Sequence, residues 1–302
     1  MKDVILSLKN ELGERNIFEN EPMNKHTSFK AGGTADIFII PENKNHIQRA
    51  IDILRENQVP FMVLGNGSNV LVSDEGYRGA VIQIYSKMCH VMAQDTIIEA
   101  KAGALLTVIA AKALENGLTG FEFASGIPGT LGGAICMNAG AYGSEIKKVL
   151  VSADVLTPDM QVKTYTAEEL QLSYRHSLIP EQNLMVLSGK IRLDKGDKVA
   201  IKERMAELAQ QRREKQPLNF PSAGSTFKRP EGYFAGKLIE DAGLKGYTIG
   251  MAQVSEKHSG FIVNKGGATA KDIWELIKYC QKVVYEKFGV QLETEVKLLG
   301  KF

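Results

Sequence analysis

The stretch Ala124-Ser-Gly-Ile-Pro-Gly-Thr-Leu-Gly-Gly-Ala-Ile-Cys-Met-Asn-Ala-Gly-Ala-Tyr-Gly143 holds six glycines within twenty residues. Each glycine costs about 1 kcal/mol relative to alanine inside a helix, so an ordinary helix is not expected here. Apolar residues such as Ile127, Leu131 and Ile135 alternate with the glycines, which argues against a solvated linker. Two interpretations remain open. The bare main chain either binds a phosphate or packs tightly against a second backbone.

A second glycine turn, Gly65-Asn-Gly-Ser-Asn-Val70, separates the apolar runs 61–64 and 70–72. A dinucleotide fingerprint needs a third glycine and a helix directly afterwards, whereas here Val70 continues as a strand. The turn is therefore either a hairpin, in which Asn and Gly adopt positive φ, or a strand–turn–strand that holds a diphosphate through its amides and the Ser68 hydroxyl. Two such turns favour the second interpretation, because together they would clamp both sides of a pyrophosphate.

On this interpretation, the predicted cofactor-binding residues all belong to the two glycine-rich segments. They are Gly65, Asn66, Gly67, Ser68, Asn69, Ser125, Gly126, Ile127, Pro128, Gly129, Thr130, Gly132, Gly133, Asn138 and Gly140.

Composition limits the class of protein. The chain has 302 residues, 44% hydrophobic and 24% charged, as expected for a soluble globular protein of two or three domains. The net charge of +2 and the lack of a basic block argue against a nucleic-acid partner. The mixed-sign run 210–216 lies at a predicted helix end, where we expect a solvated face.

Three scattered cysteines, Cys89, Cys136 and Cys280, form no Cys-x-x-Cys pair, which argues against a disulfide framework or a zinc site. Asp3 and Lys9 interrupt the N-terminal apolar run, so no signal peptide is expected. No run is long enough to span a membrane, so we expect no membrane partner. These features predict a cytoplasmic protein.

Hydrophobic periodicity predicts an α+β protein with mixed sheets, because strands cluster instead of alternating strictly with helices. The longest predicted helix covers 271–288, with Thr269 as N-cap and Gly289 as terminator. A closing strand over 290–298 would place Glu293 and Glu295 together on its polar face. Further helices are predicted at 2–16, 43–57, 105–116, 198–213 and 233–241, and further strands at 35–40, 61–64, 70–72, 80–84, 96–101, 149–156, 162–165, 184–193 and 261–263.

Seven motifs occur in the order in which one enzyme family carries them, and they cover nearly the whole chain. They are His26-Thr-Ser-Phe-Lys-Ala-Gly-Gly-Thr-Ala-Asp36, Leu64-Gly-Asn-Gly-Ser-Asn-Val-Leu-Val72, Gly126-Ile-Pro-Gly-Thr-Leu-Gly-Gly133, Asn138-Ala-Gly-Ala-Tyr-Gly143, Leu172-Ser-Tyr-Arg175, Ala223-Gly-Ser-Thr-Phe-Lys228 and Leu292-Glu-Thr-Glu-Val296. With these motifs the chain resembles the UDP-N-acetylenolpyruvoylglucosamine reductase family. Only about fifty residues separate Arg175 from Ser225, which resembles the short subfamily that lacks an inserted substrate loop.

The resemblance implies a two-part FAD-binding fold of the vanillyl-alcohol-oxidase type followed by an α+β substrate-binding domain. We expect the FAD-binding subdomains at residues 1–85 and 86–197 and the substrate-binding domain at residues 198–302. The last strand either belongs to the third domain or packs back against the FAD-binding part.

The resemblance also implies the catalytic residues. Ser225 matches the proton donor, in an exposed turn, and a weakly acidic hydroxyl can protonate only a strongly basic, carbanion-like carbon. Arg175 matches a residue that holds a carboxylate as charge grows on it. Glu295 matches the third position, and only the resemblance selects it over Glu293.

Tyr174, Lys228 and His258 are implied contacts of the substrate or of the nicotinamide cofactor, with Lys228 against a diphosphate. No metal is expected, since His26 and His176 have no His, Asp or Glu partner at metal-ligand spacing.

The implied reaction is the NADPH-dependent reduction of UDP-N-acetyl-3-O-(1-carboxyvinyl)-glucosamine to UDP-N-acetylmuramate in peptidoglycan synthesis, through non-covalently bound FAD. We expect this small-molecule substrate and a monomer or weakly associating oligomer. One alternative is an alcohol or sugar oxidase of the same architecture. Such oxidases often bind flavin through a His or Cys near the first glycine turn, and neither lies between Gly65 and Val72. The other is a non-catalytic flavin-binding module, although Arg175, Ser225 and Glu295 are all present.

Overall fold

The computed structural model describes residues 1–302, and the chain folds as two units. The first unit contains Met1–Phe18, Phe38–Asn66 and Val81–Arg212, and the second contains Glu19–Ile37, Gly67–Ala80 and Arg213–Phe302. None of the helices is long and apolar enough to cross a membrane. The division into domains at residues 85 and 197 remains a prediction.

The α+β content predicted from the sequence is confirmed. The helices are α1 (Lys2–Leu12), α2 (Lys44–Glu56), α3 (Leu106–Glu115), α4 (Leu131–Cys136), α5 (Leu178–Glu181), α6 (Lys198–Lys215), α7 (Ala235–Asp241) and α8 (Ala270–Phe288). The strands are β1 (Ile17–Pro22), β2 (Thr34–Ile39), β3 (Phe61–Leu64), β4 (Val70–Val72), β5 (Tyr77–Gln83), β6 (Val91–Gln94), β7 (Ile97–Lys101), β8 (Leu118–Thr119), β9 (Gly140–Ala141), β10 (Ser144–Glu145), β11 (Leu150–Leu156), β12 (Val162–Thr166), β13 (Met185–Arg192), β14 (Asp194–Lys195), β15 (Thr248–Ile249), β16 (Ala252–Val254), β17 (Ile262–Asn264) and β18 (Lys297–Leu299).

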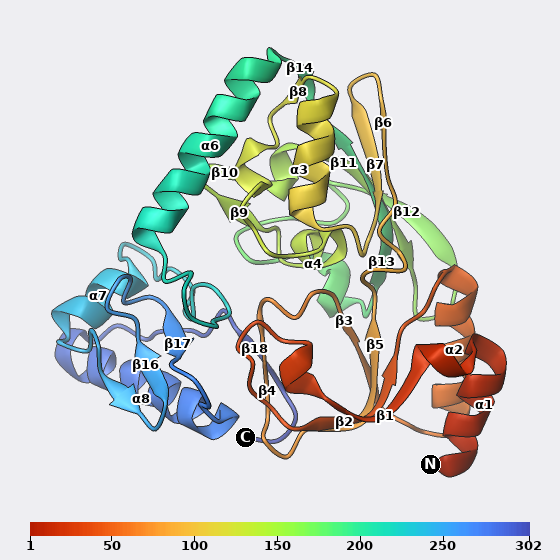
Figure 1. Cartoon of the computed structure of the whole chain (residues 1–302), viewed down its shortest axis with the longest axis horizontal. Helices are drawn as coiled ribbons and strands as arrows, with labels where there is room; N and C mark the ends of the chain where they lie inside the picture. Colours follow the sequence, from red (N-terminus) through yellow and green to blue (C-terminus); the bar gives the residue numbers. More distant parts are fainter. The chain divides into compact units, whose positions relative to one another are not determined.

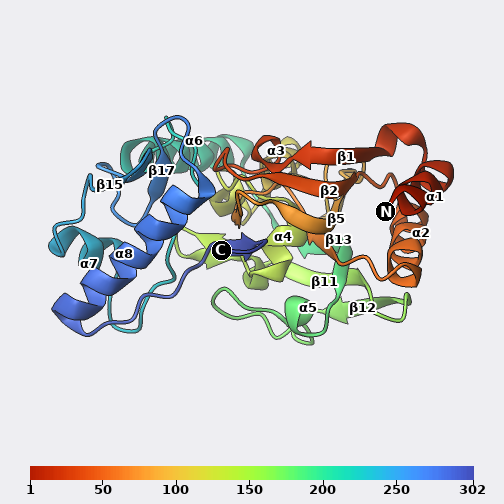
Figure 2. The same ribbon diagram turned by 90° about the horizontal axis from the view of Figure 1, so that it is seen from below.

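The first unit is built on an antiparallel five-stranded sheet in the order β12-β11-β13-β7-β6, against which α3 and α4 pack (Figure 1). The short helix α4 approaches β13 closely at Gly189. A Cβ on Gly189 would come within 3.1 Å of Ile135 and 3.3 Å of Leu131. This packing fixes the glycine-rich segment 124–143 against the sheet. At the other end of the unit, α1 and α2 lie side by side (Figure 2).

Two further sets of strands pair segments that are distant in the sequence. Strands β1, β2, β5 and β3 form a four-stranded sheet in the order β1-β2-β5-β3. Strand β18 pairs with β4 in parallel, so that Lys297 lies opposite Val70 and Leu299 opposite Val72. The end of the chain therefore pairs with a strand that lies within its first 85 residues.

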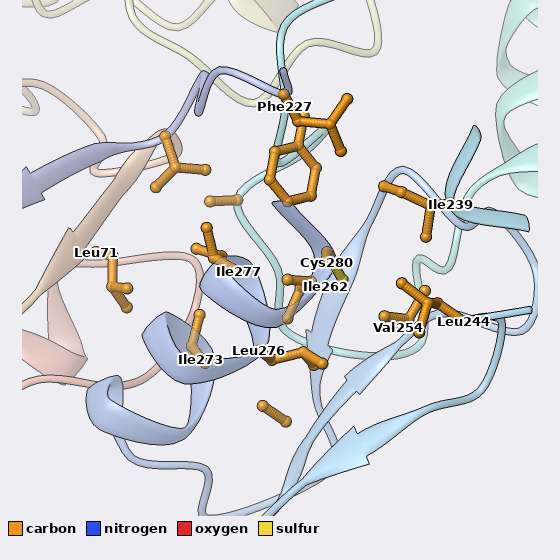
Figure 3. Close-up of a cluster of buried hydrophobic side chains, with 14 of the residues drawn as sticks. Leu71, Phe227, Ile239, Leu244, Val254, Ile262, Ile273, Leu276, Ile277 and Cys280 are labelled. Atoms are coloured by element: carbon orange, nitrogen blue, oxygen red, sulfur yellow. The ribbon is translucent and has the colours of Figure 1, made fainter. Parts of the chain in front are cut away.

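The core of the second unit lies between α8 and the three-stranded sheet β15-β16-β17. Figure 3 shows Ile273, Leu276, Ile277 and Cys280 of α8 facing this sheet and its neighbours. Burial raises the pKa of the Cys280 thiol to about 12, which marks it as a core side chain without thiolate chemistry.

The ends of α8 are as predicted. Thr269 caps the helix in a capping box with Asp272, and Gly289 ends it in the left-handed conformation at φ 67°. Asp74 adds a second cap, because its carboxylate accepts hydrogen bonds from the main-chain N–H groups of Ala270 and Lys271, both at 2.8 Å.

The predicted closing strand over 290–298 is wrong for most of its length. Regular pairing is confined to β18, and residues 290–296 make only an isolated bridge between Thr294 and Phe227. The period-two alternation fails both in this irregular segment and within β18. Leu292 is buried as predicted, whereas Leu298 is 38% exposed and Glu295 only 9% exposed.

Candidate functional site

The start of the first glycine turn, Gly65 and Asn66, meets the second glycine-rich segment within the first unit. The side-chain amide of Asn66 donates a hydrogen bond to the main-chain carbonyl of Pro128 at 2.6 Å. A Cβ on Gly65 would overlap the Thr130 hydroxyl, so a glycine is needed for this approach. The hairpin interpretation of residues 65–69 is excluded, because β3 pairs with β5 and β4 pairs with β18.

Gly67 occupies the left-handed region at φ 63°, and a Cβ there would overlap the main-chain carbonyl oxygen of His26. The same turn receives a hydrogen bond from the Ser28 amide to the Gly67 carbonyl, at 3.1 Å. The Ser28 hydroxyl next to it is buried and has no hydrogen-bond partner. A close main-chain turn beside an unsatisfied hydroxyl suits a bound polar ligand, since buried polar groups are normally paired.

The glycines of residues 124–143 serve different purposes. Gly132 packs tightly, because its Cβ position lies 3.1 Å from the Cβ of Ala102 and its amide donates to the Ala102 carbonyl at 2.8 Å. Gly133 is exposed, and its amide donates to Thr130, the N-cap of α4. Tight packing therefore explains Gly132, whereas phosphate binding by this stretch stays a prediction.

A cavity of about 610 Å³ opens where the two segments meet. Small-molecule sites fall in the same range of volume, and their walls are mainly apolar with a few polar groups. Gly65 and Thr130 lie in its wall. The other lining residues come from β3, α4, α5, β13 and nearby loops: Arg55, Phe61, Met62, Val63, Leu64, Ile84, Ala102, Gly132, Gly133, Cys136, Pro158, Ile179, Pro180, Asn183, Leu184, Met185 and Val186.

Arg212 was expected on a solvated face of residues 210–216, and for this side chain that expectation is wrong. Its guanidinium is partly buried against Gly126, whose Cβ position lies 3.1 Å from both Cδ and Nη1 of the arginine. Burial lowers the pKa of Arg212. The polar sequence of α6 offered no signal for this contact, which is made only in the folded unit. A partly desolvated cation beside the glycine segment adds to its suitability for an anion.

Other predicted cofactor residues make contacts inside the protein. Ser125 donates from its hydroxyl to the Glu122 carbonyl at 2.7 Å. Gly140 lies in β9, with the Ser144 carbonyl oxygen 2.6 Å from its Cβ position. Asn138 is fully buried, and both ends of its amide have protein partners.

In the second unit, Ser225 and Glu295 are brought together through Thr226. The Thr226 amide donates to the Gly260 carbonyl at 2.8 Å, and the Thr226 hydroxyl accepts from the Ile262 amide at 3.1 Å. The Glu295 amide in turn donates to the Thr226 carbonyl at 2.9 Å. Ser225 itself is half-buried in a loop and follows Gly224, which has φ 75°.

The structure distinguishes the two glutamates that the sequence pattern could not separate. Glu293 is exposed, and its carboxylate forms an ion pair with Lys228 at 3.0 Å. Glu295 is buried, contrary to the expectation of a solvated polar face, because residues 290–296 do not form a regular strand. Burial therefore marks Glu295 as the unusual carboxyl group of this segment.

Arg175 lies in a tight turn of the first unit, where it adopts φ 55°. Ser173 and His176 bracket it with two reciprocal main-chain hydrogen bonds of 3.2 Å. The Arg175 guanidinium carbon lies 5.1 Å from the centre of the ring of Tyr174, which is 51% exposed. A positive φ at a non-glycine residue is uncommon and occurs preferentially at functional sites.

His176, the last residue of this turn, contacts residues on both sides of it through its imidazole ring. Its Nε2 lies 2.6 Å from the Glu181 carboxylate and its Nδ1 lies 3.3 Å from the Gln171 carbonyl. Both partners accept hydrogen bonds, so the two bonds form together when both ring nitrogens carry protons. The hydrogen bond to Glu181, more than that to Gln171, raises the pKa of His176.

The third predicted contact, His258, is half-buried in the second unit. Its Nδ1 accepts a hydrogen bond from the Gly260 amide at 3.1 Å, and its ring packs edge-on against Phe261 at 5.0 Å. Burial lowers the pKa of His258, which favours the neutral imidazole with its proton on Nε2. His26 pairs with Glu21 at 2.9 Å.

Comparisons with known proteins place the chain in a family. Residues 35–165 match the FAD binding domain, and residues 216–299 match the C-terminal domain of UDP-N-acetylenolpyruvoylglucosamine reductase. The UDP-N-acetylenolpyruvoylglucosamine reductase of Caldanaerobacter subterraneus subsp. tengcongensis is 54% identical, over 97% of this chain and 97% of that protein. The chain belongs to the UDP-N-acetylenolpyruvoylglucosamine reductase family. A reductase of the same name from Agathobacter rectalis is 53% identical over 99% of this chain and 98% of its own length.

Solved structures agree with this assignment. The crystal structure of the family member from Thermus caldophilus superposes with a TM-score of 0.80 at 35% identity, over 94% of this chain and 98% of that one. A wild-type glucose dehydrogenase, the protein Phl p 4, superposes with a TM-score of 0.50 at 15% identity, over 65% of this chain and 44% of that one, which shows a shared fold alone. The predicted two-part FAD-binding fold with an additional C-terminal domain is confirmed.

Proposed function

We propose that this reductase family member uses NADPH to reduce the enolpyruvyl ether UDP-N-acetyl-3-O-(1-carboxyvinyl)-glucosamine to UDP-N-acetylmuramate, a step in peptidoglycan synthesis. The observation that carries the proposal is the 54% identity to a UDP-N-acetylenolpyruvoylglucosamine reductase along nearly the full length of both chains. The buried Glu295 beside the loop of Ser225 supports it independently.

FAD fits the residues of the glycine segments. In the first unit the partly buried Arg212 lies against Gly126, and in the second unit the buried Ser28 hydroxyl lacks a partner next to the turn of Gly67. The cavity of about 610 Å³ lies in the range of volumes of small-molecule sites. When bound, FAD supplies the hydride transfer between NADPH and the substrate. The chain's residues then have to orient the reactants and handle the proton and the growing charge.

Ser225 is proposed to donate the proton. It delivers the proton to the substrate carbon that bears the carboxylate, once hydride addition to the neighbouring methylene has made that carbon strongly basic. Thr226 fixes the loop by hydrogen bonds to Gly260 and Ile262, which limits the positions open to the Ser225 hydroxyl. Pre-orientation matters because proton transfer needs the hydroxyl within hydrogen-bond distance of the carbon.

Arg175 and Glu295 are proposed to stabilise the negative charge that spreads into the substrate carboxylate. A guanidinium offers paired donors that match a carboxylate, and Glu295 acts either in its protonated form or through a hydrogen bond. Lys228 is proposed to bind the diphosphate. Its exposed ion pair with Glu293 contributes only about 0–1 kcal/mol, so a diphosphate can replace this partner. Tyr174 and His258 remain proposed contacts of the substrate or of the nicotinamide cofactor.

The two half-reactions test the assignment of Ser225. In Ser225→Ala, flavin reduction by NADPH should stay within a factor of two of the wild type. Reoxidation by the enolpyruvyl substrate should slow by about 10²–10⁴, the usual contribution of general acid catalysis. Ser222→Ala, three residues earlier in the same loop, is the matched control and should leave both rates unchanged. Equal losses in the two half-reactions of Ser225→Ala would contradict the assigned role.

We further propose that the enzyme works in the cytoplasm as a monomer or weakly associating oligomer, with the UDP-sugar ether as its small-molecule partner. Sedimentation velocity of the purified chain at micromolar concentration tests the oligomeric part. A stable dimer or larger species at that concentration would overturn it.

A further inference from the structure

Two hydrogen bonds connect the turn that carries Arg175 to the glycine-rich segment. The Asn138 side-chain amide donates from Nδ2 to the Ser173 carbonyl at 3.0 Å, and Ser173 is the first residue of the turn. At the other end of the turn, the Ser177 hydroxyl donates to the Cys136 carbonyl at 2.6 Å. Residues 136–138 therefore hold both flanks of the Arg175 turn.

Asn138 is suited to this task by its own environment. Its side chain is fully buried, and its Oδ1 accepts a hydrogen bond from the Lys147 amide at 2.9 Å. Its main chain is left-handed at φ 44°, a conformation that asparagine tolerates better than most residues. With both amide heteroatoms bonded within the protein, the side chain cannot turn toward a cofactor without leaving a buried carbonyl or amide unpaired.

The geometry of Arg175 explains why such a fastening is needed. A non-glycine residue at φ 55° persists only where its surroundings hold it there. The two reciprocal hydrogen bonds between Ser173 and His176 close the turn but do not fix its place on the unit. The bonds made by Asn138 and Ser177 do, because they connect the turn to the segment packed on β13.

We propose that Asn138 is a positioning residue for Arg175 and not a cofactor ligand, which refines its sequence-based assignment. This inference rests on the proposed function, because Arg175 acts on the substrate only in that reaction. Asn138 acts through the turn and touches neither substrate nor cofactor. Its loss should therefore impair the substrate half-reaction selectively.

Asn138→Asp is the most discriminating variant. Aspartate tolerates the same main-chain conformation and keeps an acceptor for the Lys147 amide, but in its ionised form it cannot donate to the Ser173 carbonyl. Reoxidation of the reduced flavin by the enolpyruvyl substrate should slow by about 10- to 100-fold, as expected when a charge-stabilising group is misplaced. Flavin reduction by NADPH and the FAD dissociation constant should stay within a factor of two. Asn57→Ala is the matched control, since Asn57 makes the same kind of side-chain bond, to the Ile53 carbonyl at 2.8 Å, elsewhere in the first unit.

A double-mutant cycle with Arg175→Ala separates positioning from general destabilisation. If Asn138 acts through Arg175, Asn138→Asp should cause no further loss of reoxidation rate in the Arg175→Ala background. Multiplicative losses, equal losses in both half-reactions, or release of FAD by Asn138→Asp would each overturn the proposal.

Hydrogen exchange measures the fastening without any turnover. The amides of Ser173 and His176 should exchange at least tenfold faster in Asn138→Asp than in the wild type, while α3 stays unchanged. Unchanged exchange in the turn would overturn the inference. Failure of the proposed function looks different, because wild-type enzyme would then not be reoxidised by the enolpyruvyl substrate even though the exchange result is as expected.

Discussion

Asn69 holds the main chain of Glu295. The Asn69 side-chain amide donates to the Glu295 carbonyl at 3.1 Å, and the Lys297 amide donates back to the Asn69 carbonyl at 3.0 Å. Asn69 and Glu295 are 226 positions apart in the sequence. The last residue of the first glycine turn before β4 therefore fixes the segment that bears the buried carboxyl group. The turn proposed to bind the cofactor and the residue proposed to stabilise charge thus share one piece of structure.

The two glutamates of this segment make a matched pair of variants. Glu295→Ala should lower kcat by about 10²-fold, in the range found when one charge-stabilising donor is removed. Glu293→Ala should keep kcat, because Glu293 is exposed and only its surface pair with Lys228 is lost. Steady-state kinetics of both variants provides the measurement. A larger fall in kcat for Glu293→Ala than for Glu295→Ala would reverse the assignment.

The first glycine turn should not tolerate a side chain at Gly67. In Gly67→Ala the left-handed φ of 63° costs about 1 kcal/mol, and the new Cβ overlaps the His26 carbonyl, so the main chain of the turn must move. We expect the purified variant to contain much less FAD, read from its absorbance at the flavin band relative to protein. Gly143→Ala is the control, because Gly143 has a similar φ of 80° but nothing within 4 Å of its Cβ position. Full FAD content in Gly67→Ala would contradict the proposed role of this turn in binding FAD.

Local signals in the sequence were sufficient for the longer helices but not for α4, a short helix in the glycine-rich stretch where no ordinary helix was expected. Thr269 and Gly289 bound α8 as predicted, because capping depends on residues within one turn of the helix end. Asp74 at the same N-terminus was not foreseen, since its two hydrogen bonds reach across 196 and 197 residues. A local sequence pattern cannot predict a cap that comes from a residue so distant in the sequence.

Removal of that distant cap should destabilise the protein. Asp74→Ala leaves the Ala270 and Lys271 amides without their carboxylate partner, and we expect a loss of about 1–2 kcal/mol in the free energy of unfolding. Glu75→Ala removes the same charge one residue later and should change stability by less than about 0.5 kcal/mol. Urea denaturation of both variants measures the difference. Equal stability of the two variants would show that the second cap contributes nothing.

The pKa values of His176 and His258 should lie on opposite sides of 6.5, that of His176 above it and that of His258 below it. The pKa of His176 is raised by Glu181, so its contribution to stability is complete below 6.5 and is lost as the pH rises through the higher folded pKa. The pKa of His258 is lowered by burial, so its contribution is present above 6.5 and is lost as the pH falls through the lower folded pKa. Imidazole resonances followed by NMR test both.

The same titration has an internal control. Glu181→Gln should bring the pKa of His176 back toward 6.5 and leave that of His258 unchanged, because only the Nε2 partner of His176 is altered. A wild-type His176 that titrates at or below 6.5 would exclude the doubly hydrogen-bonded imidazolium at the Arg175 turn.

Sequence patterns predicted some parts of the candidate site and missed others, and each outcome has a physical reason. The glycine segments stood out because dense glycine among apolar residues has few structural explanations, and the contact between Asn66 and Pro128 now joins them. Burial of Glu295 and of Arg212 could not be derived, because each depends on packing against residues distant in the sequence. Periodicity misled at 290–296, where an irregular segment takes the place of a strand.

Stopped-flow absorbance at the flavin band tests the central claim most directly. The purified protein should contain bound FAD, lose its absorbance near 450 nm (about the usual flavin maximum) on mixing with NADPH, and recover it when the enolpyruvyl ether of UDP-N-acetylglucosamine is added without oxygen. A protein that binds no FAD, or a reduced flavin that oxygen reoxidises while the enolpyruvyl ether does not, would contradict the account.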